Sequence, residues 1–126
     1  MKKIVILVVF CFLLCGCGLE SGNTPKKINC DEKEKIMNSE DPNQRPAVLI
    51  DVRTADEYNE KHLDNAINMP YDSVADEIKT HTEIRFDTPI IVYCENGNRS
   101  NQAANDLTKA GYSKVYDLGT MSNCKK

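Results

Sequence analysis

Two short apolar segments, each followed closely by the start of a helix, place the strongest constraint on how this chain can fold. Residues 47–52 (AVLIDV) and residues 90–93 (IIVY) are apolar almost throughout and do not alternate with polar residues. Such continuous runs are typical of strands buried on both faces of a parallel sheet. Because predicted strands and helices alternate along the chain, we expect an α/β fold, a small parallel sheet flanked by helices on both faces.

The other elements are predicted from capping signals and helical periodicity. Thr54 and Glu57 have the spacing of a capping box, which begins a helix ending near residue 61. Gly111 marks the end of a later helix that directs Ala103, Ala104 and Leu107 inward. The predicted elements are helix 31–37, strand 47–52, helix 54–61, strand 66–69, a helix from residue 72 or 73 with Val74 and Ile78 on one face, strand 90–93, helix 99–110 and strand 114–118.

The first 16 residues have the pattern of an export signal. Two lysines precede an apolar run over residues 4–14, which is shorter than the roughly 20 residues that span a bilayer. The sequence Leu14-Cys15-Gly16-Cys17 then resembles the lipobox of bacterial lipoproteins, in which the last cysteine is acylated. We expect a signal peptide over 1–16, lipidation of Cys17, and an extracytoplasmic protein anchored to the bacterial cell membrane. A plain secretory signal or a retained membrane helix are the alternatives.

Charge and composition describe the part that follows the signal. Residues 17–27 are polar and contain glycine and proline, which is typical of a flexible tether, and residues 28–126 are expected to form one domain. Loss of the two signal lysines leaves 14 basic against 19 acidic side chains, a net charge of −5. Such an acidic protein is not expected to bind nucleic acid.

Cys30, Cys94 and Cys124 are the cysteines of the predicted domain. An odd number in an oxidising compartment leaves at least one thiol without an intramolecular partner. The chain has no C-x-x-C pair, and His62 and His81 are far apart in the sequence. Neither a metal site nor an organic cofactor is therefore predicted.

Cys94 directly follows the strand at 90–93, so it is expected at the carboxyl end of a parallel strand, where α/β proteins place reactive groups. Four residues separate it from Arg99, near which a helix is predicted to begin. Gly97 permits a tight loop whose amide groups converge on the sulfur and, with the helix N-terminus, stabilise a nucleophilic thiolate. The alternative is that Cys94 is a small buried residue that ends a core strand.

Several motifs occur in a characteristic order along the chain: Asp51-Val-Arg53, Glu57-Tyr58, His62-Leu63, NAINMP at 65–70, CENGNRS at 94–100 and DLGTMSN at 117–123. Together they resemble a single-domain rhodanese, a sulfurtransferase, over roughly residues 28–124. The resemblance implies that Cys94 takes a sulfane sulfur from thiosulfate or a persulfide and passes it to a thiophilic acceptor. Small sulfur donors and thiols are then the expected partners, and a monomer is expected.

The resemblance also assigns roles around Cys94. Arg99 is expected at the edge of the catalytic site, and Asp51 and Arg53 are expected to support the loop or to form a structural ion pair. His62 matches a mainly architectural position. The substrate-binding loop would comprise Glu95, Asn96, Gly97, Asn98, Arg99 and Ser100.

Two positions differ from many relatives. Glu95 follows the cysteine where basic or neutral residues are common, which disfavours thiosulfate as the natural donor because a dianion would be repelled. Cys124 stands where relatives often have tryptophan. A Cys30–Cys124 disulfide, two independent thiols, and a Cys124 that resolves an oxidised Cys94 are the open possibilities.

Functions besides sulfur transfer are compatible with such a scaffold. Arsenate reductases and phosphatases resemble Cys-x5-Arg, whereas this chain has four residues between Cys94 and Arg99, and the narrower loop favours sulfur transfer. Rhodanese-like folds also serve as binding modules, but inactive versions tend to lose the cysteine that this chain retains. A thiol redox sensor is the third competing function.

Overall fold

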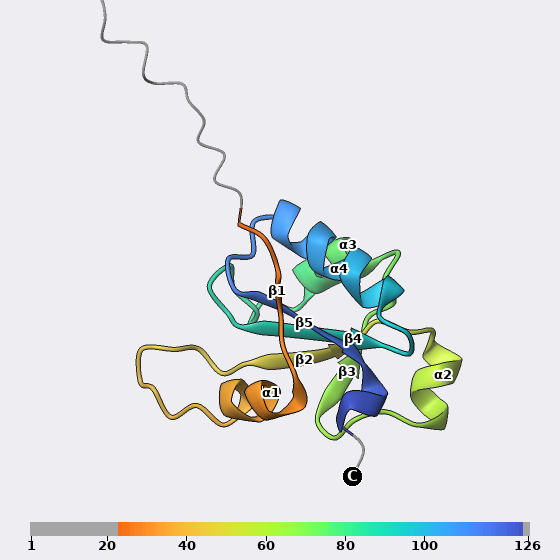
Figure 1. The fold of residues 1–126 in the computed structure, drawn as a ribbon. Helices are drawn as coiled ribbons and strands as arrows, with labels where there is room; N and C mark the ends of the chain where they lie inside the picture. Colours follow the sequence, from red (N-terminus) through yellow and green to blue (C-terminus); the bar gives the residue numbers. More distant parts are fainter. Residues whose placement is uncertain (1–22, 125–126) are drawn as a thin grey trace, which may run out of the picture.

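The computed structural model describes residues 23–124, which form one five-stranded sheet covered by helices (Figure 1). All strand pairs are parallel, and the strand order is β1-β5-β4-β2-β3. The strands are β1 Lys26–Lys27, β2 Val48–Asp51, β3 Ala66–Asn68, β4 Ile90–Cys94 and β5 Val115–Thr120. The predicted parallel sheet is confirmed. The predicted signal peptide and Cys17 lie outside the described residues.

Helices cover both faces of the sheet, as expected. In Figure 1, α3 and α4 lie on one side of the sheet and α1 on the other. The helices are α1 Cys30–Met37, α2 Ala55–Glu60, α3 Val74–Glu77, the 3₁₀ helix η2 Ile78–Thr80, α4 Asn98–Lys109 and the 3₁₀ helix η3 Met121–Cys124. None of the helices between residues 23 and 124 is long and apolar enough to cross a membrane.

The buried side chains explain why two strands are apolar throughout. In β4, Ile90, Val92 and Cys94 pack into the core beneath α3 and α4, while Ile91 and Tyr93 pack into the core on the α1 side. All five residues of β4 are fully buried. A strand with cores on both faces cannot alternate between apolar and polar residues, so the prediction from the continuous run was correct.

Local capping signals locate two of the helix starts. The Thr54 and Glu57 capping box precedes α2, as predicted, and a second box formed by Asn29 and Glu32 begins α1.

The predicted inward positions of the later helices are also buried: Val74, Ile78, Ala103, Ala104 and Leu107 have no exposed surface.

The domain begins earlier than the sequence indicated. The composition of residues 26 and 27 predicts part of the tether, but these residues form β1, in which Lys26 pairs with Tyr116 of β5. The Ile28 amide then donates to the Asp117 carbonyl at 3.0 Å. The reason is long-range backbone pairing to the edge of β5, which the polar composition of this segment does not reveal.

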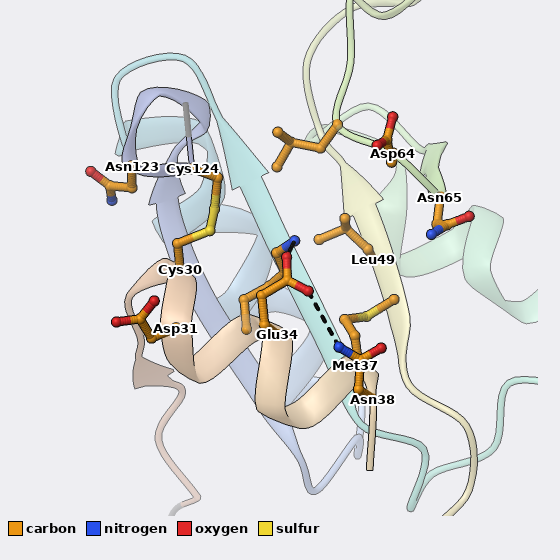
Figure 2. A pocket seen from close by; sticks show the side chains of 12 residues that line it. Cys30, Asp31, Glu34, Met37, Asn38, Leu49, Asp64, Asn65, Asn123 and Cys124 are labelled. Carbon is orange, nitrogen blue, oxygen red and sulfur yellow. Dashed lines mark hydrogen bonds and ion pairs between the residues drawn. A yellow bond between two sulfur atoms is a disulfide. The ribbon is translucent and has the colours of Figure 1, made fainter. Parts of the chain in front are cut away.

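A disulfide between Cys30 and Cys124 joins the first residue of α1 to the last residue of η3 (Figure 2). The two cysteines are 94 positions apart in sequence, and their Cα atoms are 5.2 Å apart. Of the three thiol arrangements that the sequence leaves open, the structure contains this one. Cys94 is the free cysteine of the part of the chain that is described.

Replacing both Cys30 and Cys124 by serine is expected to lower the free energy of unfolding by about 2–5 kcal/mol, because the bond closes a long loop of the unfolded chain. Urea unfolding followed by circular dichroism measures the change. A reductant should lower the urea midpoint of the wild type to that of the double variant, and it should leave the midpoint of the double variant unchanged. An equal response of both proteins to reductant would contradict a stabilising disulfide.

Candidate active site

Cys94 ends the central strand β4, and its sulfur accepts hydrogen bonds from the backbone that follows. The Gly97 amide lies 3.0 Å and the Ser100 amide 3.3 Å from Cys94 Sγ. Gly97 is the N-cap of α4 and has a φ of 89°, a left-handed conformation that L side chains rarely adopt. This turn directs two amide groups at the start of α4 toward one sulfur atom, an arrangement that can hold negative charge.

The loop does not direct all of its amides to the sulfur, so the expected convergence of successive amides is only partly correct. The Asn98 amide donates to Asn96 Oδ1 at 3.0 Å. An asparagine side chain commonly accepts a hydrogen bond from the backbone two residues later, and here this local bond competes with the sulfur. Gly97 and Ser100 are therefore the two amide donors that the structure shows at Cys94 Sγ.

The last residues of β5 help to hold the same loop. The pairing of β4 with β5 shifts register after Val92, and Cys94 is then paired with Thr120. At this bulge the Gly119 amide donates to Asp117 Oδ1 at 2.9 Å, and Ser100 Oγ donates to the Gly119 carbonyl at 3.5 Å. The start of α4 is thus bonded to both the sulfur and the end of β5.

The side chain of Cys94 is fully enclosed in this conformation. Its residue has no exposed surface, and Asn96 Oδ1 lies 3.9 Å from Cys94 Sγ. Glu95, Asn96 and Asn98 are exposed, so the cover over the sulfur is part of a surface loop. A molecule from solvent can contact Sγ only after this loop or a neighbouring side chain moves.

Arg99 is bound to Glu57 of α2. Its two terminal nitrogens lie 3.0 and 3.2 Å from the two carboxylate oxygens of Glu57. These hydrogen bonds lower the pKa of Glu57 to about 2, and they raise the pKa of Arg99.

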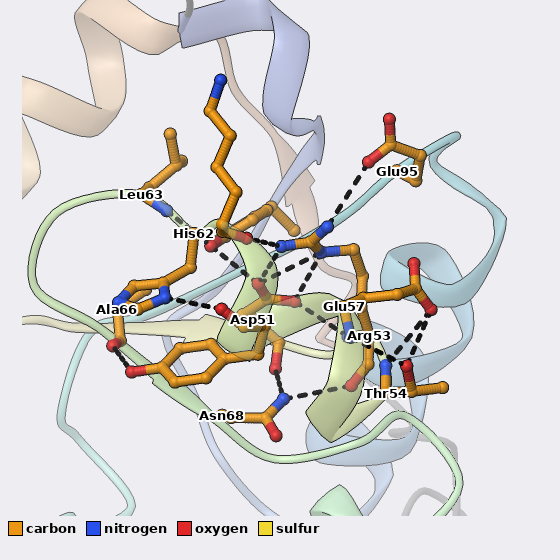
Figure 3. A network of polar contacts seen from close by, with 12 residues as sticks. Asp51, Arg53, Thr54, Glu57, His62, Leu63, Ala66, Asn68 and Glu95 are labelled. Atoms are coloured by element: carbon orange, nitrogen blue, oxygen red, sulfur yellow. Dashed lines mark hydrogen bonds and ion pairs between the residues drawn. The ribbon is translucent and has the colours of Figure 1, made fainter.

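Arg53 lies in a buried polar network with Asp51 (Figure 3). Arg53 Nε is 3.0 Å from Asp51 Oδ1, and Arg53 Nη2 is 2.7 Å from Asp51 Oδ2. The hydrogen bond with Asp51 raises the pKa of Arg53. Arg53 Nη1 also lies 3.5 Å from a carboxylate oxygen of Glu95, the residue after Cys94. The pair is thus a structural ion pair that also contacts the loop.

Sequence reasoning missed two residues of this network. Tyr93 OH donates to Asp51 Oδ2 at 2.9 Å and accepts from the Leu63 amide at 3.0 Å. Burial raises the pKa of Tyr93, so its hydroxyl remains a neutral donor. Asn68 Nδ2 donates to the carbonyls of Asp51 and Arg53, each at 3.0 Å. The sequence did contain a signal for each of them. Tyr93 is a polar side chain at the end of an otherwise aliphatic run, and Asn68 is a polar side chain within a short predicted strand.

Two further expectations concern histidine and metal. His62 stacks on Tyr58 with ring centroids 3.8 Å apart, and its Nδ1 lies 2.8 Å from the Tyr58 carbonyl. Between residues 23 and 124, no cluster of three or more histidine, cysteine or acidic side chains could hold a metal ion.

Fold and site together define an α/β domain in which a loop after the central strand encloses one free cysteine. The chain belongs to the rhodanese-like domain family, whose sequence model matches residues 31–121. Its relatives include proteins named thiosulfate sulfurtransferase.

Three curated proteins illustrate the similarity. The thiosulfate sulfurtransferase PspE of Escherichia coli is 36% identical over 74 residues, which cover 59% of this chain and 70% of that protein. A putative mitochondrial thiosulfate sulfurtransferase of Schizosaccharomyces pombe is 30% identical over 115 residues, covering 82% of this chain and 81% of that protein. The uncharacterized protein YqhL of Bacillus subtilis is 39% identical, and the match covers 59% of this chain and 56% of YqhL.

Solved structures agree with the fold. A rhodanese with anions from E. coli has a TM-score of 0.57 and 32% identity, covering 61% of this chain and 89% of that one. The human single-domain sulfurtransferase TSTD1 has a TM-score of 0.65 and covers 79% of this chain and 94% of that one. At 20% identity, the human protein supports the fold alone.

Replacing Gly97 by alanine is expected to cost about 1–2 kcal/mol of stability through backbone strain. An added Cβ would meet nothing within 4 Å, so steric contact does not contribute. Urea unfolding measures the cost. Gly97→Asn is the matched control, because asparagine tolerates left-handed backbone better than alanine. Equal losses for alanine and asparagine would contradict strain as the cause.

The Glu57–Arg99 pair is expected to make stability depend on pH. Because the pKa of Glu57 falls from 4.5 to about 2 in the folded protein, its contribution is complete above pH 4.5 and is lost as the pH falls toward 2. In Glu57→Gln, urea midpoints should decline less steeply over this range, and Arg99→Gln should have the same effect. Parallel pH profiles for the wild type and Glu57→Gln would argue against the pair.

Proposed function

We propose that this protein is a sulfurtransferase that carries a sulfane sulfur as a persulfide on Cys94, between a donor, thiosulfate or a persulfide, and a thiophilic acceptor. The observation that supports this most directly is the pair of amide hydrogen bonds from Gly97 and Ser100 to Cys94 Sγ. These donors would hold the negative charge of the thiolate before transfer. After transfer, the terminal sulfur of the persulfide would carry the charge.

The reaction needs no external oxidant or reductant. The Cys94 thiolate attacks the sulfane sulfur of the donor, a new S–S bond forms, and the S–S bond of the donor breaks. The leaving group takes the electron pair and departs as sulfite from thiosulfate or as a thiolate from a persulfide. A nucleophilic acceptor then attacks the terminal sulfur of the Cys94 persulfide, which restores the thiolate.

The contacts of Arg99 favour sulfur transfer over arsenate reduction or phosphoryl transfer. An enzyme that binds a tetrahedral oxyanion at a cysteine needs cationic groups directed at its oxygens. Here both terminal nitrogens of Arg99 are bonded to Glu57. With four residues between Cys94 and Arg99, the loop surrounds a single sulfur atom.

A binding module and a redox sensor are less consistent with the contacts of the cysteines. A binding module has no need for amide donors aimed at a free thiol, whereas this loop has two. A sensor in which Cys124 resolves an oxidised Cys94 would need Cys124 as a thiol, and Cys124 is bonded to Cys30. Both observations favour transfer.

We also propose that the protein is an extracytoplasmic, monomeric bacterial lipoprotein, with a signal peptide over 1–16 and a lipid on Cys17. The basic, apolar and cysteine-containing start of the sequence supports this. The disulfide between Cys30 and Cys124 fits an oxidising compartment, where such bonds persist.

Sulfur loading of Cys94 tests the proposal. The full chain is incubated with thiosulfate or a persulfide donor and digested with trypsin, which releases residues 86–99 as a peptide whose only cysteine is Cys94. We expect this peptide to gain one sulfur atom, because the thiolate attacks the donor, and mass spectrometry detects the gain. Cyanide should remove the added sulfur as thiocyanate.

Two variants control the measurement. Cys94→Ser should abolish the gain of sulfur, and Cys30→Ser combined with Cys124→Ser should retain it. If the peptide remains unmodified with every donor, or if sulfur still transfers to cyanide through Cys94→Ser, the proposed function is wrong.

A further inference from the structure

We propose that Glu95 and Glu57 determine donor specificity, so that the Cys94 site accepts a persulfide of low charge and disfavours the thiosulfate dianion. This inference rests on the proposed function and specifies its substrate class. The two carboxylates act by neutralising the arginines that would otherwise attract an anionic donor.

Arg53 is not available to an incoming anion. Its side chain is 5% exposed and is bonded to the buried Asp51 on one side. On the other side, Nη1 lies 3.5 Å from Glu95 Oε2 (Figure 3). The Glu95 side chain is 56% exposed, so the charge that solvent meets here is the carboxylate and not the guanidinium.

Arg99 is neutralised in the same way. Glu57 accepts hydrogen bonds from both of its terminal nitrogens and stays ionised above a pKa of about 2. The two side chains are similarly exposed, 27% for Arg99 and 33% for Glu57. An anion that approaches Arg99 therefore also approaches the carboxylate of Glu57, which is about as exposed to solvent and repels the anion.

The charged side chains that contact the loop after Cys94 and the start of α4 do not favour a dianion. The groups joined by these contacts are two guanidinium groups and three carboxylates, those of Asp51, Glu57 and Glu95, a net charge of −1. With the attacking thiolate of Cys94 included, the net charge of these groups is −2. Thiosulfate carries two negative charges, whereas a persulfide without other acidic groups carries one at most. Repulsion grows with the product of the charges, so it is strongest for thiosulfate.

A cavity lies beside the disulfide, and the loop after Cys94 does not line it. It measures about 480 Å³ and lies among α1, β2 and residues 63–65 (Figure 2). None of residues 94–100 lines it. A donor that occupied this cavity would therefore not contact the loop that encloses Cys94.

Loading rates of the full chain with two donors test the inference. The probes are thiosulfate and the persulfide of N-acetylcysteine amide, and the readout is sulfur on the 86–99 peptide against time. Glu95→Gln is expected to raise the second-order rate constant for thiosulfate by about tenfold, since one negative charge next to the path of a dianion is removed. Glu57→Gln should act in the same direction, and the double variant should exceed either single change.

Two controls separate charge from structure. Glu40→Gln removes an exposed carboxylate from the segment between α1 and β2 and should leave both rate constants unchanged. In each variant of Glu95 or Glu57 the persulfide rate constant should rise by a smaller factor than the thiosulfate rate constant, because the persulfide carries at most one negative charge and thiosulfate carries two. Glutamine at position 57 can still accept a hydrogen bond from Thr54, so the cap of α2 is retained.

Salt gives a readout that a purely structural role would not affect. In the wild type, the thiosulfate rate constant should rise between about 0.05 and 0.5 M KCl, because salt screens repulsion between like charges. In the double variant this rise should largely disappear. If the persulfide loads Cys94 but thiosulfate loading responds neither to the variants nor to salt, the inference is wrong and the proposed function stands. If neither donor loads Cys94, both are wrong.

Discussion

The buried carboxylate of Asp51 holds together the part of the molecule on which the site depends. Asp51 has no exposed surface, and a buried charge is tolerated only when hydrogen bonds and an opposite charge compensate it. Arg53 and the Tyr93 hydroxyl provide that compensation. Since Asp51 ends β2 and Tyr93 precedes Cys94 in β4, the carboxylate joins the carboxyl ends of the central strand and its neighbour β2. Cys94 is therefore presented from a rigid edge, while the exposed loop after it covers the sulfur.

The backbone amides and the arginine side chains near Cys94 make different kinds of contact. Backbone amides of Gly97 and Ser100 point to the sulfur and supply local positive potential without a mobile charge. The arginines, in contrast, point to carboxylates and connect elements: Arg99 joins α4 to α2, and Arg53 joins β2 to the loop. A site built in this way can hold the charge of one sulfur atom, and under the proposed donor specificity it would offer little attraction to a larger anion. The disulfide then restrains η3, which directly follows β5.

Much of the fold could be predicted because its signals are local. The buried strands, the capping box at Thr54 and the inward faces of α3 and α4 follow from short patterns, and the structure agrees with each. The position of Cys94 at the end of a central strand follows from the same reasoning. Predictions were less successful where one hydrogen bond competes with another, or where a strand forms only by pairing with a distant part of the chain. The Asn98 amide bonds to Asn96 instead of the sulfur, and β1 forms from residues whose composition resembles a linker.

The sequence by itself determined most of the elements, their order and the position of Cys94 at the end of a strand, because hydrophobic burial and helix capping depend on neighbours within a few positions. Only the tertiary structure decided which charges face one another. Glu57 and Arg99 are 42 positions apart, as are Asp51 and Tyr93, and Cys30 is 94 positions from Cys124. Pairing over such distances depends on strand order and register, which no local pattern encodes. For this reason the place of the cysteine was visible in the sequence, but the pairing of Arg99 with Glu57 and of Arg53 with Glu95 was not.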